Sequence, residues 1–285
     1  MHPRNLHQSG YQFASLIKAI PELEAHLVTT PAGTVSIDFA NAQSVLLLNQ
    51  AILKQDYGIA YWTLPPQYLC PPVPGRADYL HHLADLLEAD PRIDHNAKVK
   101  GLDIGTGASL IYPILGHQIY GWQFVGSDIN PGALALAKQW QSFNKLPVKL
   151  RTQENAKAIF HGVIQHNEQF TFTLCNPPFH MSAADALQGT QRKWRNLGKQ
   201  PTQQLNFGGH APELWCEGGE RAFVTQMLTE SADFATQVQW FTCLVSKAEN
   251  LTALEKVASQ LAVKEWRIVN MSQGQKRSRF IAWHF

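Results

Sequence analysis

The chain has 285 residues, 45% of them hydrophobic and 16% charged, with a formal net charge of +2. This composition excludes a disordered or fibrous protein and supports one large domain with an appendage. No stretch approaches the length of a membrane span, and the four cysteines include no CxxC pair. We therefore expect a cytoplasmic protein with buried thiols, no membrane contact and no metal.

The first part of the chain, residues 1 to about 95, predicts a small α+β extension. Its apolar spacing and proline content indicate a short strand at 35–39, a proline-rich crossing at 64–74, and helices at 11–20, 41–54 and 78–89.

From residue 99 the pattern changes to alternating strands and helices, which predicts a doubly wound parallel sheet. The last segment predicts a terminal hairpin, with strands at 263–269 and 279–285 on either side of Gly274. The earlier strands are expected at 99–103, 122–128, 148–152, 170–175 and 240–246.

The first of these strands runs into a glycine-rich turn, where Gly105 and Gly107 let the backbone approach a ligand. A dinucleotide fingerprint needs a third small residue where Leu110 stands, so a nucleotide without a pyrophosphate fits better. The second strand ends in Asp128, which is placed to accept hydrogen bonds from ribose hydroxyls. Asn130 before Pro131 is the better candidate for the following helix cap.

The fourth strand ends abruptly in Asn176, Pro177, Pro178 and Phe179. The prolines cannot extend a central strand, so the chain leaves the sheet and exposes an amide oxygen, free carbonyls and a flat ring. Such a corner suits a planar amino group, although an isolated Asn-Pro-Pro also occurs as an ordinary turn.

These elements resemble the class I S-adenosylmethionine-dependent methyltransferases: Asp103-Ile-Gly-Thr-Gly matches the first motif, Asp128 the second-strand acid and Asn176-Pro-Pro-Phe the fourth motif. Over nearly the whole chain the resemblance narrows to the bacterial 23S ribosomal RNA adenine-N6 methyltransferase family. Further matching residues are Pro74-Gly-Arg76, Asn206-Phe-Gly-Gly and Glu213-Leu-Trp-Cys-Glu-Gly-Gly-Glu.

This resemblance implies a Rossmann-like fold with a mostly parallel seven-stranded sheet, a C-terminal antiparallel hairpin and a small α+β extension. It divides the chain into residues 1–95, expected to bind RNA and cover the cofactor, and a methyltransferase domain at 96–285. The implied cofactor is S-adenosylmethionine, contacted by Arg76, Asp103, Gly105, Gly107, Asp128, Thr152 and Asn176.

The implied reaction methylates the N6 amino group of one adenine in 23S rRNA, either free or in a pre-ribosomal particle, by a monomeric enzyme. The Asn176 side-chain oxygen and the Pro177 carbonyl would accept the two amino protons, with Pro178 shaping the corner and Phe179 stacking on the base. An extruded or unpaired adenine would be required.

Basic residues are clustered rather than numerous, and they indicate where RNA phosphates bind. A solvated charged face is the alternative interpretation of such a run. The predicted RNA contacts are Arg4, Arg192, Lys193, Trp194, Arg195, Lys276 and Arg277.

Two other functions are compatible with parts of this pattern. A protein glutamine N5-methyltransferase would use the same Asn-Pro-Pro corner on an amide nitrogen, although Phe179 replaces the tyrosine usual there. A non-catalytic RNA-binding protein could keep the fold, but the intact Asp103, Gly105, Asp128 and Asn176 disfavour it.

Overall fold

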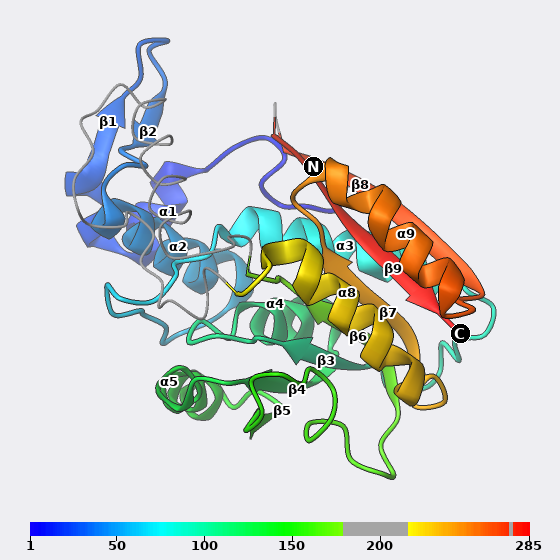
Figure 1. The fold of residues 1–285 in the computed structure, drawn as a ribbon. Helices are drawn as coiled ribbons and strands as arrows, with labels where there is room; N and C mark the ends of the chain where they lie inside the picture. The colour runs from blue at the N-terminus through cyan, green and yellow to red at the C-terminus, as the bar shows by residue number, and fades with distance from the viewer. Residues whose placement is uncertain (179–215, 274–275) are drawn as a thin grey trace.

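The computed structural model describes residues 1–178, 216–273 and 276–285. Seven strands form one sheet in the order β5-β4-β3-β6-β7-β9-β8 (Figure 1), and β1 pairs with β2 in a separate antiparallel ribbon. The strands are β1 Leu27–Thr29, β2 Val35–Ile37, β3 Lys100–Ile104, β4 Gln123–Asp128, β5 Val148–Thr152, β6 Phe170–Cys175, β7 Val238–Leu244, β8 Glu265–Gln273 and β9 Lys276–His284.

The five strands from β5 to β7 are parallel, whereas β9 lies antiparallel between β7 and β8. The predicted parallel sheet and terminal hairpin are therefore confirmed. The chain order reverses between β3 and β6, and ligands bind beyond the carboxyl ends of the strands at such a switch point.

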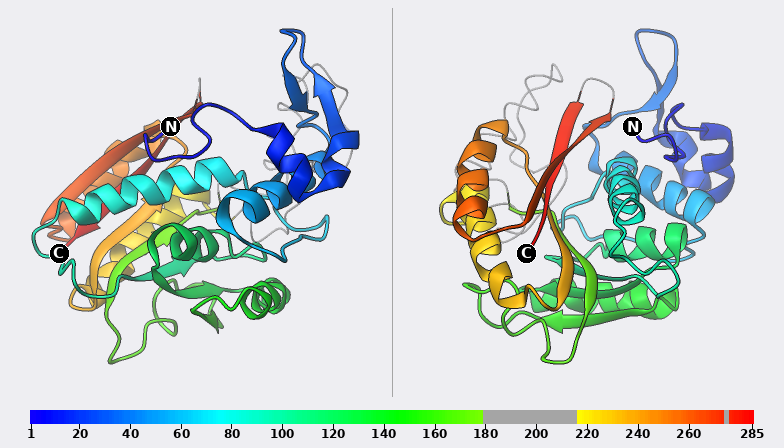
Figure 2. Two further views of the ribbon diagram at one scale, coloured as in Figure 1. Left: turned by 180° about the vertical axis from the view of Figure 1, so that it is seen from behind. Right: turned by 90° about the vertical axis from the view of Figure 1, so that its right-hand side faces the viewer.

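Helices cover both faces of the sheet, with α3, α4 and α5 on one side and α8 and α9 on the other (Figure 2). The helices are α1 Phe13–Ala19, α2 Ala42–Tyr57, α3 Val73–Glu88, α4 Ile111–Tyr120, α5 Pro131–Phe143, α8 Gly219–Ser231 and α9 Leu251–Gln260, with short 3₁₀ turns at Pro21–His26, Ala232–Phe234 and Ala248–Asn250.

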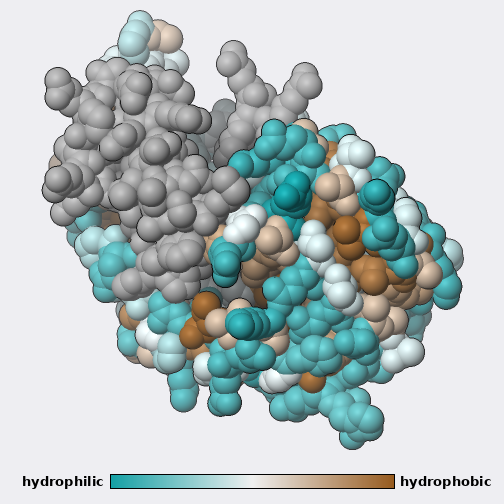
Figure 3. Space-filling view, viewed as in Figure 1, coloured by the Kyte–Doolittle hydropathy of each residue, from teal (hydrophilic) through white to brown (hydrophobic). Residues whose placement is uncertain are grey.

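The sheet is buried on both faces, as the alternation of side chains along β9 illustrates. Phe280 and Ala282 belong to the core beneath α3 and α4. Ile281 and Trp283 belong to the second core, beneath α8 and α9. In Figure 3 apolar side chains gather in the seam between α8 and α9, on a face that is otherwise mainly hydrophilic.

The N-terminal segment carries the β1–β2 ribbon, which projects from the body of the molecule (Figure 2). The helix predicted at residue 78 begins earlier, at Val73, because Pro74 occupies the first turn, where a missing N–H costs no hydrogen bond. This helix, α3, is fixed to the sheet by the Tyr79 hydroxyl, which lies 2.7 Å from the Thr242 hydroxyl on β7.

None of the helices that the structure describes is both long and apolar enough to cross a bilayer.

Candidate active site

A cavity of about 720 Å³ opens at the carboxyl ends of the parallel strands. Register explains the convergence: Ile104 on β3 pairs with Ser127 on β4 and with Cys175 on β6. The next residue of each strand therefore reaches the same edge of the sheet. The predicted site residues that line the cavity are Arg76, Gly105, Gly107, Asp128, Asn176 and Pro178.

The glycine-rich turn after β3 forms one wall of the cavity. Gly105 and Gly107 have φ angles of 70° and 63°, a region where a Cβ atom would be strained. Leu110, which ends the turn before α4, is fully buried and also has a positive φ of 52°. A buried leucine in this conformation indicates that surrounding packing fixes the shape of the turn.

Asp128 connects the second strand to that turn. Its carboxylate accepts hydrogen bonds of 2.8 Å from the Gly107 and Asn130 backbone N–H groups. Burial raises the pKa of Asp128, and these backbone donors oppose the rise. Asn130 caps α5 by accepting from the Gly132 and Ala133 N–H groups, so Asp128 is not the cap.

Asp103 lies behind the turn and is not among the residues lining the cavity. The Thr106 hydroxyl donates to its Oδ2 at 2.7 Å, and Oδ1 is buried without a partner among the described residues. Burial raises the pKa of this carboxyl to about 8; the Thr106 hydrogen bond opposes the rise, and nearby Asp128 adds to it. The structure thus places Asp103 as a support of the turn, one layer from the space that a cofactor would fill.

Arg76 approaches the cavity from the first turns of α3. Its guanidinium lies 5.7 Å from the centre of the Tyr112 ring. Among the described residues no carboxylate lies within ion-pair distance of Arg76, so its charge is available to an anionic ligand.

Asn176 follows β6 at the opposite wall of the cavity. Its side-chain Oδ1 is buried and has no hydrogen-bond partner among the described residues. A buried acceptor without a partner costs about 1–3 kcal/mol, which a ligand N–H would recover. Pro177 is buried outside the lining, Pro178 lines the cavity, and Phe179 lies outside the described residues.

The loop after β5 forms the remaining wall, and here the lining residue is Gln153 rather than Thr152. Thr152 is exposed and pairs with Asp128 across the sheet, whereas Gln153 is buried. The Gln153 amide donates to the His161 carbonyl at 2.8 Å. Strand alternation accounts for the difference of one position and could have identified Gln153.

The predicted RNA contacts lie in three places. The Arg4 guanidinium donates to Asp85 on α3 and, at 3.0 Å, to the His81 carbonyl. Lys276 and Arg277 begin β9, opposite Gln273 and Ser272 of β8. The predicted contacts Arg192, Lys193, Trp194 and Arg195 lie outside the described residues.

One group of metal-ligand side chains occurs in the part of the chain that the structure describes: His2, His82 and Asp85. The Arg4 backbone N–H donates to His2 Nδ1 at 3.1 Å, which leaves the ring proton on Nε2. That nitrogen lies 2.8 Å from Asp85 Oδ2 and donates to it. This tautomer favours a hydrogen-bonded anchor of the N-terminal segment over a metal site.

A family model described as RNA methyltransferase matches residues 1–285. The chain belongs to this family. The ribosomal RNA large subunit methyltransferase F of Pseudoalteromonas translucida is 52% identical over the whole chain and 93% of its own length. The protein of the same name from Pseudomonas putida strain W619 is 54% identical with the same coverage. Membership confirms the sequence-based expectation of an RNA methyltransferase and disfavours the two alternatives.

Solved structures agree with this family in fold. The human METTL16 catalytic domain in complex with MAT2A 3'UTR hairpin 1 has a TM-score of 0.84 and 28% identity, covering all of this chain and 95% of that one. The N-terminal domain of human METTL16 in complex with SAH has a TM-score of 0.80 and 26% identity, covering 100% and 98%. The class I methyltransferase architecture is therefore confirmed.

Proposed function

We propose that this RNA methyltransferase transfers the methyl group of S-adenosylmethionine to the N6 amino group of one adenine in the RNA of the large ribosomal subunit, 23S rRNA, in the cytoplasm. The unpartnered, buried Asn176 Oδ1 carries this proposal, because a planar amino group is the donor that such an acceptor at a cavity wall fits. The names of the relatives support ribosomal RNA as the substrate.

The cavity residues fit S-adenosylmethionine by their chemistry. Arg76 offers an unpaired guanidinium for the methionine carboxylate, and Asp128 offers carboxylate lone pairs for the ribose hydroxyls. Gln153 and Ile159 line the same cavity and would flank the adenine of the cofactor. The SAH named in the METTL16 complex supports the same cofactor class.

The methyl donor supplies an electrophilic carbon attached to a sulfonium. An adenine amino nitrogen is a weak nucleophile because its lone pair is delocalised into the ring. Asn176 Oδ1 and the Pro177 carbonyl would accept hydrogen bonds from the two amino N–H groups. This pairing would direct the lone pair of the amino nitrogen out of the ring plane, toward the cavity. In this proposal Phe179, which lies outside the described residues, would stack on the extruded base, and the released proton passes to water.

Product analysis tests the reaction. Purified protein is incubated with labelled S-adenosylmethionine and either unmodified 23S rRNA, precursor large-subunit particles or cellular protein, followed by digestion to nucleosides or amino acids. We expect N6-methyladenosine from the RNA. Label in glutamine would instead identify a protein substrate, and label from the particle alone would show that assembly must precede methylation.

Two variants separate catalysis from cofactor binding. Asn176→Ala removes the acceptor and should abolish transfer while S-adenosylmethionine still binds. Asp128→Ala should weaken S-adenosylmethionine binding itself, as measured by calorimetry. Equal effects of both variants on cofactor affinity would contradict the assigned roles.

The remaining parts of the proposal concern assembly and cofactors. Residues 1–95, which include Arg4, bind RNA together with Lys276, Arg277 and the segment at 192–195. The enzyme acts as a monomer. Transfer from a sulfonium expels a neutral thioether, so no metal is required. Light scattering of the active protein tests whether it is a monomer. Activity on prefolded RNA, after the protein has been dialysed against a chelator, tests whether a metal is required.

A further inference from the structure

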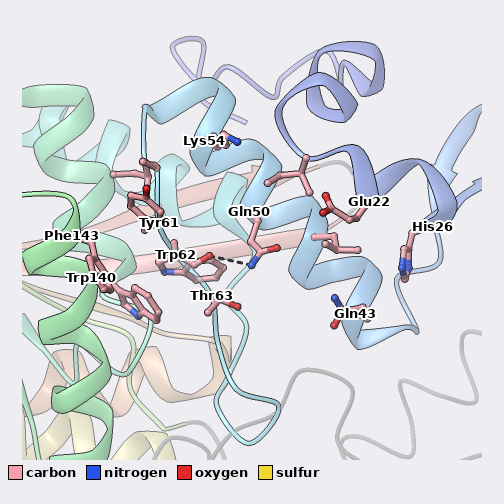
Figure 4. A pocket seen from close by; sticks show the side chains of 14 residues that line it. Glu22, His26, Gln43, Gln50, Lys54, Tyr61, Trp62, Thr63, Trp140 and Phe143 are labelled. Carbon is pink, nitrogen blue, oxygen red and sulfur yellow. Dashed lines mark hydrogen bonds between the residues drawn. The ribbon is translucent and has the colours of Figure 1, made fainter.

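A second cavity, of about 590 Å³, lies away from the active site, between the N-terminal helices and α5. Figure 4 shows its walls: α2 with Gln43, Gln50 and Lys54 on one side, α5 with Trp140 and Phe143 on the other, and the segment 61–63 between them. We refer to this cavity as the α2–α5 groove. Its volume is within the range that accommodates a small planar ligand.

Two aromatic side chains form a ledge at the α5 side of the groove. Tyr61 is 62% exposed and Phe143 is 59% exposed. Their ring centres are 5.7 Å apart at an interplanar angle of 49°. Adjacent rings with this much apolar surface in water are a typical platform for a ligand.

The backbone at Tyr61 is fixed to the end of α5. Asn144, at the end of α5, donates from Nδ2 to the Tyr61 carbonyl at 2.8 Å, and its Oδ1 accepts from the Tyr61 N–H at 3.3 Å. The same Nδ2 also donates to the Trp140 carbonyl at 2.9 Å. These bonds hold the segment that carries Tyr61 beside α5, so the two rings stay next to each other with less backbone entropy to lose when a ligand binds.

Polar groups surround the ledge on the opposite wall. The Gln50 amide donates to the Trp62 carbonyl at 3.1 Å, which leaves its side-chain oxygen facing the groove (Figure 4). The Lys54 ammonium uses one donor on the Ala19 carbonyl, and Glu22 adds a carboxylate. Together these groups provide a cation, amides and an acceptor for amino groups, which match the phosphate and edges of a nucleotide.

Two tryptophans of the groove are hydrogen-bonded to the turn that borders the active-site cavity. Trp62 Nε1 donates to the Ser109 carbonyl at 2.8 Å, and Trp140 Nε1 donates to the Ala108 carbonyl at 3.0 Å. Both acceptors belong to the glycine-rich turn, and Ser109 also lines the active-site cavity. A ligand in the groove would therefore be separated from the active-site cavity by these tryptophans and the turn.

We infer that the α2–α5 groove binds a second, unpaired nucleotide of the substrate RNA, whose base packs against the exposed rings of Tyr61 and Phe143. This inference rests on the proposed rRNA methylation. Stacking accepts any base, while Glu22 favours a base with an exocyclic amino group and Lys54 pairs with the phosphate. An aliphatic or acidic peptide would leave these flat, exposed rings and mixed polar groups poorly matched.

The test compares Tyr61→Ala and Phe143→Ala with the wild type on unmodified 23S rRNA. We expect each change to weaken RNA binding about tenfold, in line with the loss of one stacking contact. The KM for RNA should rise correspondingly, while kcat at saturating RNA and the affinity for S-adenosylmethionine stay unchanged. Tyr61→Phe should retain binding because the ring remains.

Controls separate this inference from the function on which it rests. Ile268→Ala removes an apolar side chain that is 39% exposed and lies outside both the groove and residues 1–95, and it should leave RNA affinity unchanged. Photo-crosslinking with 4-thiouridine RNA should attach label to peptides containing Tyr61 or Phe143. Wild-type RNA affinity in both alanine variants, with an active wild type and crosslinks only elsewhere, would overturn the inference alone. An inactive wild type would instead contradict the proposed function.

Discussion

At the scale of single residues, two buried oxygens, one at the active-site cavity and one behind it, lack hydrogen-bond partners among the described residues. Asn176 lines the cavity, and its Oδ1 is the acceptor that we propose for a substrate amino group, whereas Asp103 lies behind the glycine-rich turn. The first position serves recognition. Asp103 is one layer deeper, so its substitution should change the stability of the fold more than the affinity for a ligand.

The Asp103 carboxyl leads to a pH prediction. Its pKa of about 8 in the folded state exceeds the ordinary value of 3.8, so the folded state binds the proton more tightly. The stability of wild type relative to Asp103→Asn should be greatest near pH 4, fall by at most about 1.4 kcal/mol per pH unit up to about pH 8, and then level off. Denaturant unfolding of both proteins across this range measures the difference.

One result would contradict the raised pKa of Asp103. If the stability difference between wild type and Asp103→Asn stays constant from pH 5 to pH 8, the carboxyl is already ionised in the folded protein. Thr106→Val provides a matched control, because it removes the one side-chain donor to Asp103 in the described part of the chain. Without this hydrogen bond, which favours the charged form, the pKa of Asp103 in the folded state should rise further. The fall in stability should then continue to a higher pH than in the wild type.

Residue types and strand order predicted most of the site, because a residue that directly follows a parallel strand reaches the common edge of the sheet. That argument correctly grouped Gly105, Asp128 and Asn176 at the cavity. It placed Thr152 there as well, where the side chain of the next residue, Gln153, points inward. Arg4 shows another limit of prediction from sequence: its hydrogen bond to Asp85 joins residues 81 positions apart, and no local pattern indicates such a contact.

At the scale of secondary-structure elements, α8 positions a loop of the active site through the carboxylate of Glu230. This side chain accepts from the backbone N–H groups of Ile159, Phe160 and His161, at 2.9, 2.7 and 2.6 Å for the shortest contacts. Ile159 lines the cavity. One carboxylate thus fixes a segment of the cavity wall.

Glu230→Gln tests this coupling. The amide can still accept from some of the three donors but loses its charge, so we expect a loss of about 2 kcal/mol in unfolding free energy. The dissociation constant for S-adenosylmethionine should rise severalfold because the loop is less well held. Calorimetric binding and denaturant unfolding measure the two effects separately.

Thr229→Ala is the matched control on the same helix. It removes only a hydrogen bond to the Thr225 carbonyl within α8 and should leave cofactor affinity unchanged. If Glu230→Gln loses stability yet binds S-adenosylmethionine as the wild type does, then the loop keeps its shape without the carboxylate.

Element boundaries were predictable where apolar periodicity was regular and less so near prolines. The strands from β3 to β7 and the terminal hairpin were located within a few residues. The start of α3 was placed five residues late, because Pro74 suggests a break but is tolerated in a first turn. The α2–α5 groove was not anticipated, since Tyr61 and Phe143 meet only through packing of two separate segments.

At the scale of the whole molecule, the first residues of the chain and the cofactor cavity are connected through α3. The Asn5 amide donates to the Pro74 carbonyl at 2.9 Å and to Asp78 Oδ1 at 3.2 Å. The His2 backbone N–H donates to the same Asp78 oxygen at 2.6 Å. Arg76 lies between these two anchor points on the helix and faces the cavity.

Loss of that anchor should therefore reach the active site. Asn5→Ala removes both hydrogen bonds to α3, together with the acceptor of the His7 N–H, and should lower the unfolding free energy by about 1–3 kcal/mol, since buried partners are left unsatisfied. Cofactor affinity should fall because the first turns of α3 hold Arg76 less firmly, while kcat at saturating S-adenosylmethionine stays near the wild-type value. Gln8→Ala, an exposed change in the same segment, should alter neither quantity. Reduced stability with unchanged affinity would mean that Arg76 is positioned by its packing on Tyr112 rather than through the N-terminal segment.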